Sequence, residues 1–115
     1  MKYLSTRNDS LNQSFNDVLF QGLSKDGGLY LPKDWPTINL DKLLHLSYQE
    51  VAIEIIYPFV RENINKEDLS QVITQTYVNF KSDKIAPLHK LDKNKFLLEL
   101  FYGPTYAFKD YALQF

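Results

Sequence analysis

The sequence of 115 residues contains no cysteine and only two histidines, His45 and His89. The lack of thiols excludes a disulfide framework, a thiolate nucleophile and a cysteine-rich zinc site. The two imidazoles lie too far apart in sequence to match a metal-binding spacing, so no metal site is predicted. Any chemistry of this chain must therefore come from other residue types.

The sequence also lacks an excess of charge and a long apolar run. Its 13 basic and 14 acidic residues leave a formal net charge of −1, which gives no basic field for nucleic acid. No stretch approaches the roughly 20 apolar residues of a membrane span. The first residues turn polar too soon for a signal peptide. We therefore expect a cytoplasmic protein that binds neither nucleic acid nor a membrane.

Aromatic side chains, in contrast, are abundant, with eight tyrosines, eight phenylalanines and one tryptophan. Such residues dominate the burial of protein cores. Their clusters here mostly lack the interleaved basic residues of a surface that stacks nucleobases. We interpret them as packing residues of a globular chain.

The first third of the sequence predicts small elements separated by turns. Lys2–Ser5 resembles a short strand, and Thr6–Ser10 a polar loop. Ser14 followed by Asp17 has the spacing of a capping box, which predicts a short helix there. Gly22 stands where the end of that helix needs a positive φ.

A second group of turn signals follows this helix. Lys25-Asp26-Gly27-Gly28 predicts a tight turn, because both glycines accept a positive φ at low cost. The same two glycines would also let a backbone approach a ligand, but the turn is the favoured interpretation. Leu29–Leu31 is then a brief strand that Pro32 ends, and Asp41–Leu46 a short helix.

Two amphipathic helices are predicted in the middle of the chain. Ser47 with Glu50, and Asn65 with Asp68, have capping-box spacing at the starts of these helices. Pro58 falls late in the first helix, where we expect a kink or an early end. The two helices should form an antiparallel hairpin that serves as a scaffold. The residues expected to face inward are Val51, Ala52, Ile55, Ile56, Phe59, Val60, Leu69, Val72, Ile73, Thr76, Tyr77 and Phe80.

A change of pattern near 81–84 predicts a domain boundary. Two extended segments, Ile85–Leu91 and Phe96–Phe101, enclose a turn at 92–94. The second segment is almost continuously apolar, which is typical of a strand buried on both faces in an α/β sheet. Thr105 is then a suitable N-cap for a last helix. We expect an α+β domain over 1–83, and the first strand and helix of an α/β domain over 84–115.

That last helix stops at Phe115 without a capping residue, and the strand before it has too few partners for a stable sheet. We therefore expect the chain to be the front part of a longer polypeptide.

Lys109 is the candidate chemical centre. The spacing from Thr105 places its amine in the first or second turn of the last helix, among aromatic and small apolar residues. A cation is disfavoured in that position. A neutral amine is what Schiff-base chemistry requires. A surface lysine beside Asp110 is the alternative that these residues leave open.

Three motifs resemble those of threonine synthases. Glu99–Asp110, E-L-F-Y-G-P-T-Y-A-F-K-D, is similar to the lysine motif of that family, E-L-F/W-H-G-P-T-x-A-F-K-D. Tyr3–Arg7 resembles its opening, Y-x-S-T-R, and Gly22–Pro32 its segment G-L-x-x-D-G-G-L-Y-x-P. The motifs stand in the family's order and extend over the whole chain. The resemblance is to the microbial and fungal branch, which carries this N-terminal domain.

The resemblance implies a fold-type II pyridoxal 5'-phosphate enzyme that converts O-phospho-L-homoserine and water to L-threonine and phosphate. Lys109 would be the catalytic residue that binds the cofactor, and once released it would act as a general base. Thr105 would cap the helix or also line the cofactor site, while Asp110 would support the helix start. Arg7 would be either a contact of the substrate phosphate or a structural residue.

The chain also departs from the family pattern. Tyr102 stands where the motif usually has histidine, and its role is not predicted. The loop for the cofactor phosphate and the residue facing the pyridine nitrogen are expected beyond Phe115. We therefore expect residues 1–115 alone to be inactive. Two alternatives remain, a threonine-synthase-like phospho-lyase and a non-catalytic N-terminal interaction domain. The sequence does not predict the oligomeric state.

Overall fold

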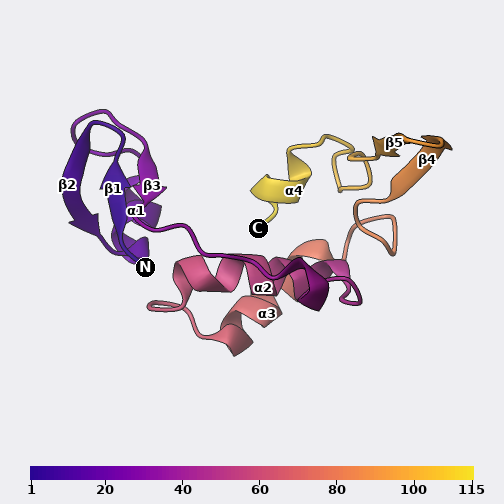
Figure 1. Ribbon diagram of the computed structural model, residues 1–115, viewed down its shortest axis with the longest axis horizontal. Coiled ribbons are helices and arrows are strands. Elements are labelled where there is room, and N and C mark those ends of the chain that lie inside the picture. Colours follow the sequence, from indigo (N-terminus) through magenta and orange to yellow (C-terminus); the bar gives the residue numbers. More distant parts are fainter.

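The computed structural model describes residues 1–115 and shows three parts along the chain (Figure 1). A three-stranded sheet with α1 lies at one end, a pair of helices, α2 and α3, follows, and a strand hairpin with α4 completes the chain. The extents of 47 × 29 × 28 Å make the molecule elongated. The predicted α+β class is confirmed.

The N-terminal sheet is antiparallel with strand order β2-β1-β3. Its strands are β1 (Tyr3–Ser5), β2 (Asn8–Gln13) and β3 (Tyr30–Pro32). The prediction of a polar loop over Thr6–Ser10 was wrong, because β2 begins at Asn8 and pairs with β1. Most side chains of β2 are exposed, so backbone hydrogen bonding rather than apolar burial holds this strand.

Helix α1 (Phe15–Gln21) begins and ends as predicted. The Asp17 amide donates to the Ser14 hydroxyl oxygen at 3.2 Å, and the Ser14 amide donates to the Asp17 carboxylate at 2.9 Å. Gly22 follows the helix with φ 69°. The reciprocal pair satisfies two amides that have no partner within the helix.

Helices α2 (Tyr48–Val60) and α3 (Lys66–Tyr77) lie side by side, as the predicted hairpin requires (Figure 1). Ser47 and Glu50 form the expected capping box. Asn65 caps α3 by accepting the Asp68 amide at 2.8 Å. None of the helices in residues 1–115 has both the length and the apolar character needed to cross a membrane.

One local prediction in this region was inaccurate. The helix expected at Asp41–Leu46 is only a short 3-10 turn, η1 (Leu40–Lys42), that the Asn39 side chain caps. Helix α2 runs through Pro58 and ends two residues later, at Val60. Proline at position 58 lacks the N–H that would donate to the carbonyl of residue 54, and the helix ends within the same turn.

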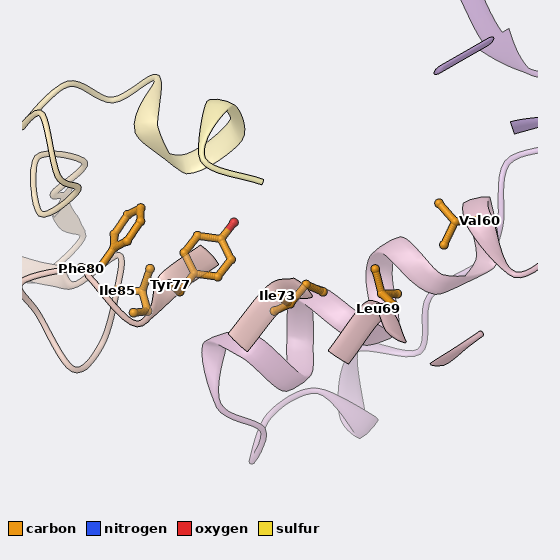
Figure 2. Packing of buried hydrophobic residues seen from close by; sticks show 6 residues of the cluster. All are labelled: Val60, Leu69, Ile73, Tyr77, Phe80 and Ile85. Carbon is orange, nitrogen blue, oxygen red and sulfur yellow. The ribbon is translucent and has the colours of Figure 1, made fainter. Parts of the chain in front are cut away.

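The core is a row of apolar side chains along α3 (Figure 2). Leu69, Ile73 and Tyr77 point inward as predicted, whereas Val72 is 43% exposed and lies outside the core. Only 12 of the 115 residues are buried, so this row carries most of the apolar burial of the chain. Its members are Val60, Leu69, Ile73, Tyr77, Phe80 and Ile85.

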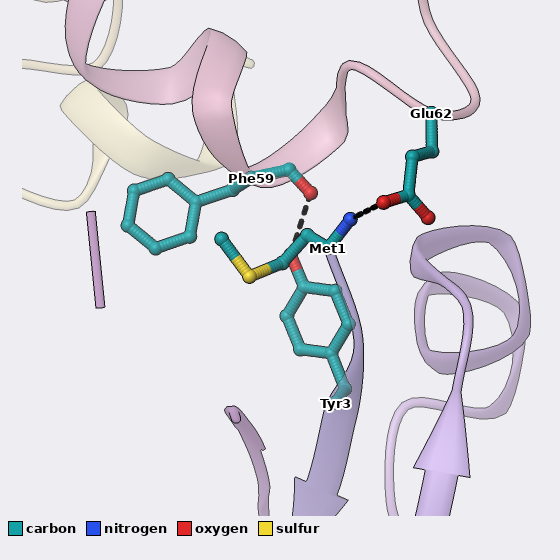
Figure 3. Close-up of polar contacts among 4 residues, drawn as sticks. All are labelled: Met1, Tyr3, Phe59 and Glu62. Atoms are coloured by element: carbon teal, nitrogen blue, oxygen red, sulfur yellow. Dashed lines mark hydrogen bonds and ion pairs between the residues drawn. The ribbon is translucent and has the colours of Figure 1, made fainter. Parts of the chain in front are cut away.

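Contacts of the first residues fasten the sheet to the end of α2 (Figure 3). The Tyr3 hydroxyl donates to the Phe59 carbonyl oxygen at 2.9 Å, and the ammonium group of Met1 forms an ion pair with Glu62. The hydrogen bond from this ammonium holds the pKa of Glu62 below its usual range. The Trp35 and Phe59 rings add an edge-to-face contact at 6.2 Å. Polar contacts therefore hold the sheet to the end of α2, and an aromatic contact holds the connector that follows β3.

The predicted strand pair is present as an antiparallel hairpin of β4 (Leu88–Asp92) and β5 (Lys95–Leu98). The expectation that the second strand is buried on both faces was wrong for this chain. Phe96 and Leu98 are each 53% exposed, because no other element of residues 1–115 covers this two-stranded sheet.

Helix α4 (Asp110–Leu113) begins later than predicted. Thr105 was expected to cap it, but the Thr105 hydroxyl donates to the Asp110 side chain at 2.8 Å instead. Tyr106 has φ 62°, a left-handed conformation that cannot belong to a right-handed helix. The segment between Thr105 and Asp110 is therefore a loop.

We predict that Ile73→Ala lowers the free energy of unfolding by about 3 kcal/mol, because it opens a cavity in the fully buried row. Urea unfolding followed by circular dichroism measures this change. The control Thr74→Ala alters the exposed face of the same helix and should change stability by less than about 0.5 kcal/mol. Equal losses for both variants would contradict the assignment of the core.

Candidate active site

The loop before α4 is closed by the side chain of Asp110, which is only 3% exposed. The Thr105 amide donates to this carboxylate at 2.7 Å and the Thr105 hydroxyl donates at 2.8 Å. The Gln114 side-chain amide adds a hydrogen bond at 3.3 Å. We call Gly103, Thr105 and Asp110 the loop clasp, because they join the two ends of the loop.

Gly103 completes the loop clasp through its lack of a side chain. A Cβ atom at this position would lie 2.8 Å from Asp110 Cγ and still closer to Asp110 Cβ and Oδ2. The Gly103 carbonyl oxygen also accepts the Tyr106 amide at 3.1 Å. Only glycine leaves room for the carboxylate to lie against the backbone here.

Burial alone would raise the pKa of Asp110, but the hydrogen bonds it accepts outweigh this effect. The Thr105 amide and hydroxyl, the Gln114 side chain and the Ala107 backbone together hold the pKa of Asp110 below its usual range. The loop is thus closed around a charged carboxylate.

Lys109 occupies the position just before α4, so the prediction that it lies in the first or second helical turn was wrong. Its side chain is exposed and forms neither a hydrogen bond nor an ion pair, although Asp110 is its neighbour in sequence. Phe108 is 65% exposed, and no cleft of this chain includes Lys109. The apolar surroundings inferred from the sequence are therefore not formed by residues 1–115. The amine is nevertheless free of any partner.

The loop is anchored to α3 through Tyr111. The Tyr77 hydroxyl donates to the Tyr111 carbonyl oxygen at 2.9 Å, and the Phe80 and Tyr111 rings meet edge to face at 5.0 Å. The Tyr111 hydroxyl in turn donates to the Ile85 carbonyl oxygen at 2.8 Å. Position 111 follows Lys109 closely, so these contacts fix the backbone that carries the amine.

Tyr102, whose role the sequence does not predict, faces Glu99. Its hydroxyl donates to the Glu99 carboxylate at 3.0 Å, and this hydrogen bond raises the pKa of Tyr102. Its carbonyl oxygen accepts the Lys81 amide at 2.8 Å. Tyr102 therefore joins the start of the lysine motif to the end of the helical hairpin.

Sequence reasoning missed a second lysine at this place. The Lys81 ammonium lies 3.7 Å from the centre of the Tyr106 ring and also contacts the Tyr106 hydroxyl. The contact stabilises the one residue of the loop that has a positive φ. No signal in the sequence links these two residues, because they are far apart along the chain.

The two N-terminal motifs form a single unit around Asp26. The Ser5 hydroxyl and the Gly28 amide each donate to the Asp26 carboxylate at 2.8 Å, and the Arg7 guanidinium donates to the Asp26 carbonyl oxygen at 3.0 Å. Gly27 has φ 77°, which confirms the predicted turn. A Cβ atom at Gly28 would collide with Ser5 Oγ. The group that lies close to Gly28 is therefore a side chain of the same protein, Ser5, and not a ligand.

Arg7 and Lys109 are not brought together by residues 1–115. Arg7 belongs to the turn between β1 and β2 of the N-terminal sheet, whereas Lys109 directly precedes α4, which lies over the helical hairpin (Figure 1). No hydrogen bond or ion pair joins the two parts of the proposed site.

Comparison with known proteins decides the relationship of this chain. A family model described as threonine synthase N terminus matches residues 2–77. The chain belongs to the threonine synthase family. It is 44% identical to threonine synthase of Pseudomonas aeruginosa over 99% of the chain and 25% of that protein, and 42% identical to that of Saccharomyces cerevisiae over 98% and 24%.

Solved threonine synthases have the same fold over this region. The PLP-bound enzyme of Brucella melitensis matches 96% of the chain with a TM-score of 0.91 and 42% identity, and the enzyme of Escherichia coli matches 96% with 0.85 and 31%. These matches cover 24% and 25% of the two solved chains. The chain therefore spans about a quarter of the length of its relatives, and corresponds to the N-terminal part of threonine synthases.

We predict that Asp26 makes the fold sensitive to acid. Hydrogen bonds, first from the Gly28 amide and then from Ser5, lower the pKa of Asp26 in the folded state. Its stabilisation is therefore complete above the unfolded pKa of about 3.9, and is lost as the pH falls through the lower folded pKa. Urea midpoints between pH 2 and 6 should fall less steeply in Asp26→Asn than in the wild type.

Asp9→Asn is the matched control, because the Asp9 side chain is exposed on β2 and forms no hydrogen bond. It should keep the pH dependence of the wild type. The same profile for Asp26→Asn and Asp9→Asn would contradict a specific role for Asp26.

Proposed function

We propose that this chain is the N-terminal part of a threonine synthase that converts O-phospho-L-homoserine and water to L-threonine and phosphate, with pyridoxal 5'-phosphate bound to Lys109. The observation that carries the proposal is the unpaired, exposed amine of Lys109, held on a hydrogen-bonded loop within Glu99–Asp110, the segment that resembles the lysine motif of this family. Lys81, in contrast, is engaged by Tyr106 of the same loop.

The residues present fit the cofactor in their chemistry. The Lys109 amine has no hydrogen-bond or ion-pair partner, because Asp110 is occupied within the loop clasp. It can therefore join an aldehyde without breaking an ion pair, once it has lost its proton. When bound, pyridoxal phosphate supplies an electron sink that stabilises negative charge on the substrate carbons. Lys109 would hold the cofactor and, once released, carry protons at Cα and Cβ of the substrate.

Thr105 and Arg7 complete the proposed site with smaller roles. The Thr105 hydroxyl donates its hydrogen bond to Asp110. Its oxygen can therefore accept a hydrogen bond from a ligand at the cofactor site. One N–H of Arg7 is engaged by the Asp26 carbonyl, which leaves further donors for the substrate phosphate. Arg7 also lines an open depression of the surface, together with Asp9 and Leu31.

We further propose that 1–83 form the N-terminal domain and 84–115 begin the catalytic domain of fold type II. Contacts through Ile85 and Tyr111 would then belong to the interface between the two domains. The phosphate loop and the partner of the pyridine nitrogen would be supplied by later residues of the whole enzyme. On this basis we expect residues 1–115 alone to be inactive. We also propose that the whole enzyme acts in the cytoplasm.

A second candidate is a phospho-lyase that uses the same lysine but forms no threonine. The chain is also 35% identical to a protein named threonine synthase-like 2 from Xenopus laevis, over 98% of the chain. Release of phosphate without L-threonine from the purified full-length protein would favour this candidate, whereas equal amounts of both products would favour the synthase.

We predict that borohydride reduction of the full-length protein with pyridoxal phosphate leaves the cofactor on the peptide that contains Lys109, as mass spectrometry would show. Lys109→Ala should lose this label and its activity. Lys93→Ala is the matched control, because Lys93 is exposed in the turn between β4 and β5, and it should be labelled like the wild type. A label on a different lysine would contradict the proposal.

The inactivity of residues 1–115 is a separate prediction. The isolated chain, given pyridoxal phosphate and O-phospho-L-homoserine, should release no phosphate above the rate of a Lys109→Ala sample. Lys109-dependent turnover by the isolated chain would show that the site is already complete.

A further inference from the structure

Asp110 is a buried carboxylate beside an exposed amine, and the two are not paired. A surface Asp next to a Lys would normally stay solvated. Here the Asp110 residue is 3% exposed, and its carboxylate accepts hydrogen bonds from Thr105 and Gln114. The negative charge is therefore stabilised by groups of the loop and not by Lys109. Such an arrangement leaves the neighbouring ammonium or amine without a counter-ion.

The loop clasp also restricts the direction in which the Lys109 side chain points. Asp110 and Lys109 are consecutive, so holding the Asp110 side chain against Gly103 restricts the planar peptide between them. The Lys109 carbonyl oxygen also accepts the Ala112 amide at 3.1 Å and the Leu113 amide at 2.9 Å, and together these contacts restrict the direction in which the Lys109 side chain leaves the backbone. Thr105, on the other side of the loop, is joined to the same carboxylate by two hydrogen bonds. The loop therefore has little freedom to turn Lys109 away.

We infer that Asp110 is a positioning residue, which holds the Lys109 amine in the direction needed to join the cofactor and keeps it free of an ion pair. This inference rests on the proposed function. It assigns no contact between Asp110 and the cofactor or substrate, since the carboxylate is enclosed by its own loop.

Two substitutions of Asp110 separate the effect of its hydrogen bonds from the effect of its negative charge. In Asp110→Asn the amide oxygen can accept the Thr105 amide, while its NH2 group donates to the Thr105 hydroxyl oxygen. The Gln114 amide can rotate and offer its oxygen in return. The asparagine therefore keeps the loop clasp, whereas Asp110→Ala removes it. Gly103→Ala breaks it from the opposite side, because the new Cβ displaces Asp110.

The experiment follows attachment of pyridoxal phosphate to the full-length protein after the cofactor has been removed. The absorbance of lysine-bound cofactor gives the rate, and borohydride trapping with mass spectrometry gives the fraction on Lys109. Asp110→Ala and Gly103→Ala should each attach the cofactor about 100-fold more slowly, the penalty of a misplaced reacting group. Asp110→Asn should restore most of the rate.

Leu69→Ala is the control for general destabilisation, because Leu69 is buried in the core row and does not contact the loop. It should lower the unfolding midpoint and leave the attachment rate unchanged. Attachment to Asp110→Ala at the wild-type rate, or slowing by Leu69→Ala to the same degree, would overturn the positioning role. Attachment of wild-type protein at another lysine would overturn the proposed function as well, so the two failures are distinguishable.

Discussion

The edge-to-face contacts of Tyr77, Phe80 and Tyr111 connect the helical scaffold to the lysine loop, and the rest of the candidate site depends on them. The ring centres lie 5.1 Å apart for the first pair and 5.0 Å for the second. Such pairs contribute roughly 0.5–1.5 kcal/mol each beyond the burial of their area. Helix α4 has only four residues, which is too short to be stable by itself. Its place is therefore determined by this aromatic contact and by the Tyr77 hydroxyl.

The two motif regions are built in the same way although they share no sequence. In each, a carboxylate accepts hydrogen bonds from a hydroxyl and from a backbone amide, Asp26 at one site and Asp110 at the other. In each, a glycine lies so close to the cluster that a Cβ would collide, Gly28 with Ser5 and Gly103 with Asp110. The glycine and the acid of each motif are thus explained by each other, through a local contact that needs no bound ligand.

Features set by neighbouring residues were predictable from the sequence. The capping residues Ser14, Ser47 and Asn65 fixed the helix starts, because a cap and its amide are only a few residues apart. Strand β2 was missed, since its polar side chains carry no pattern and its pairing with β1 is made by the backbone. The burial of β5 was overestimated because an apolar run does not say which element covers it.

In the candidate site, too, features set by neighbouring residues were predictable and features set by distant contacts were not. Lys109 was found from its motif, but the start of α4 was misplaced, because a threonine that donates to Asp110 has the same sequence signature as one that caps a helix. The partners of Tyr102 and Tyr106 depend on how the loop returns to the end of α3. The spacing of neighbouring residues in the sequence does not predict that the loop folds back onto the end of α3.

The exposed hairpin of β4 and β5 has a consequence for how this chain behaves in solution. Its outer edges carry unpaired backbone groups, and Phe96, Leu97 and Leu98 leave apolar surface open on both faces. Unprotected edges of this kind add strands from other molecules. The net charge of −1 provides little repulsion between copies. At high concentration, residues 1–115 by themselves would therefore associate through the open edges of this hairpin.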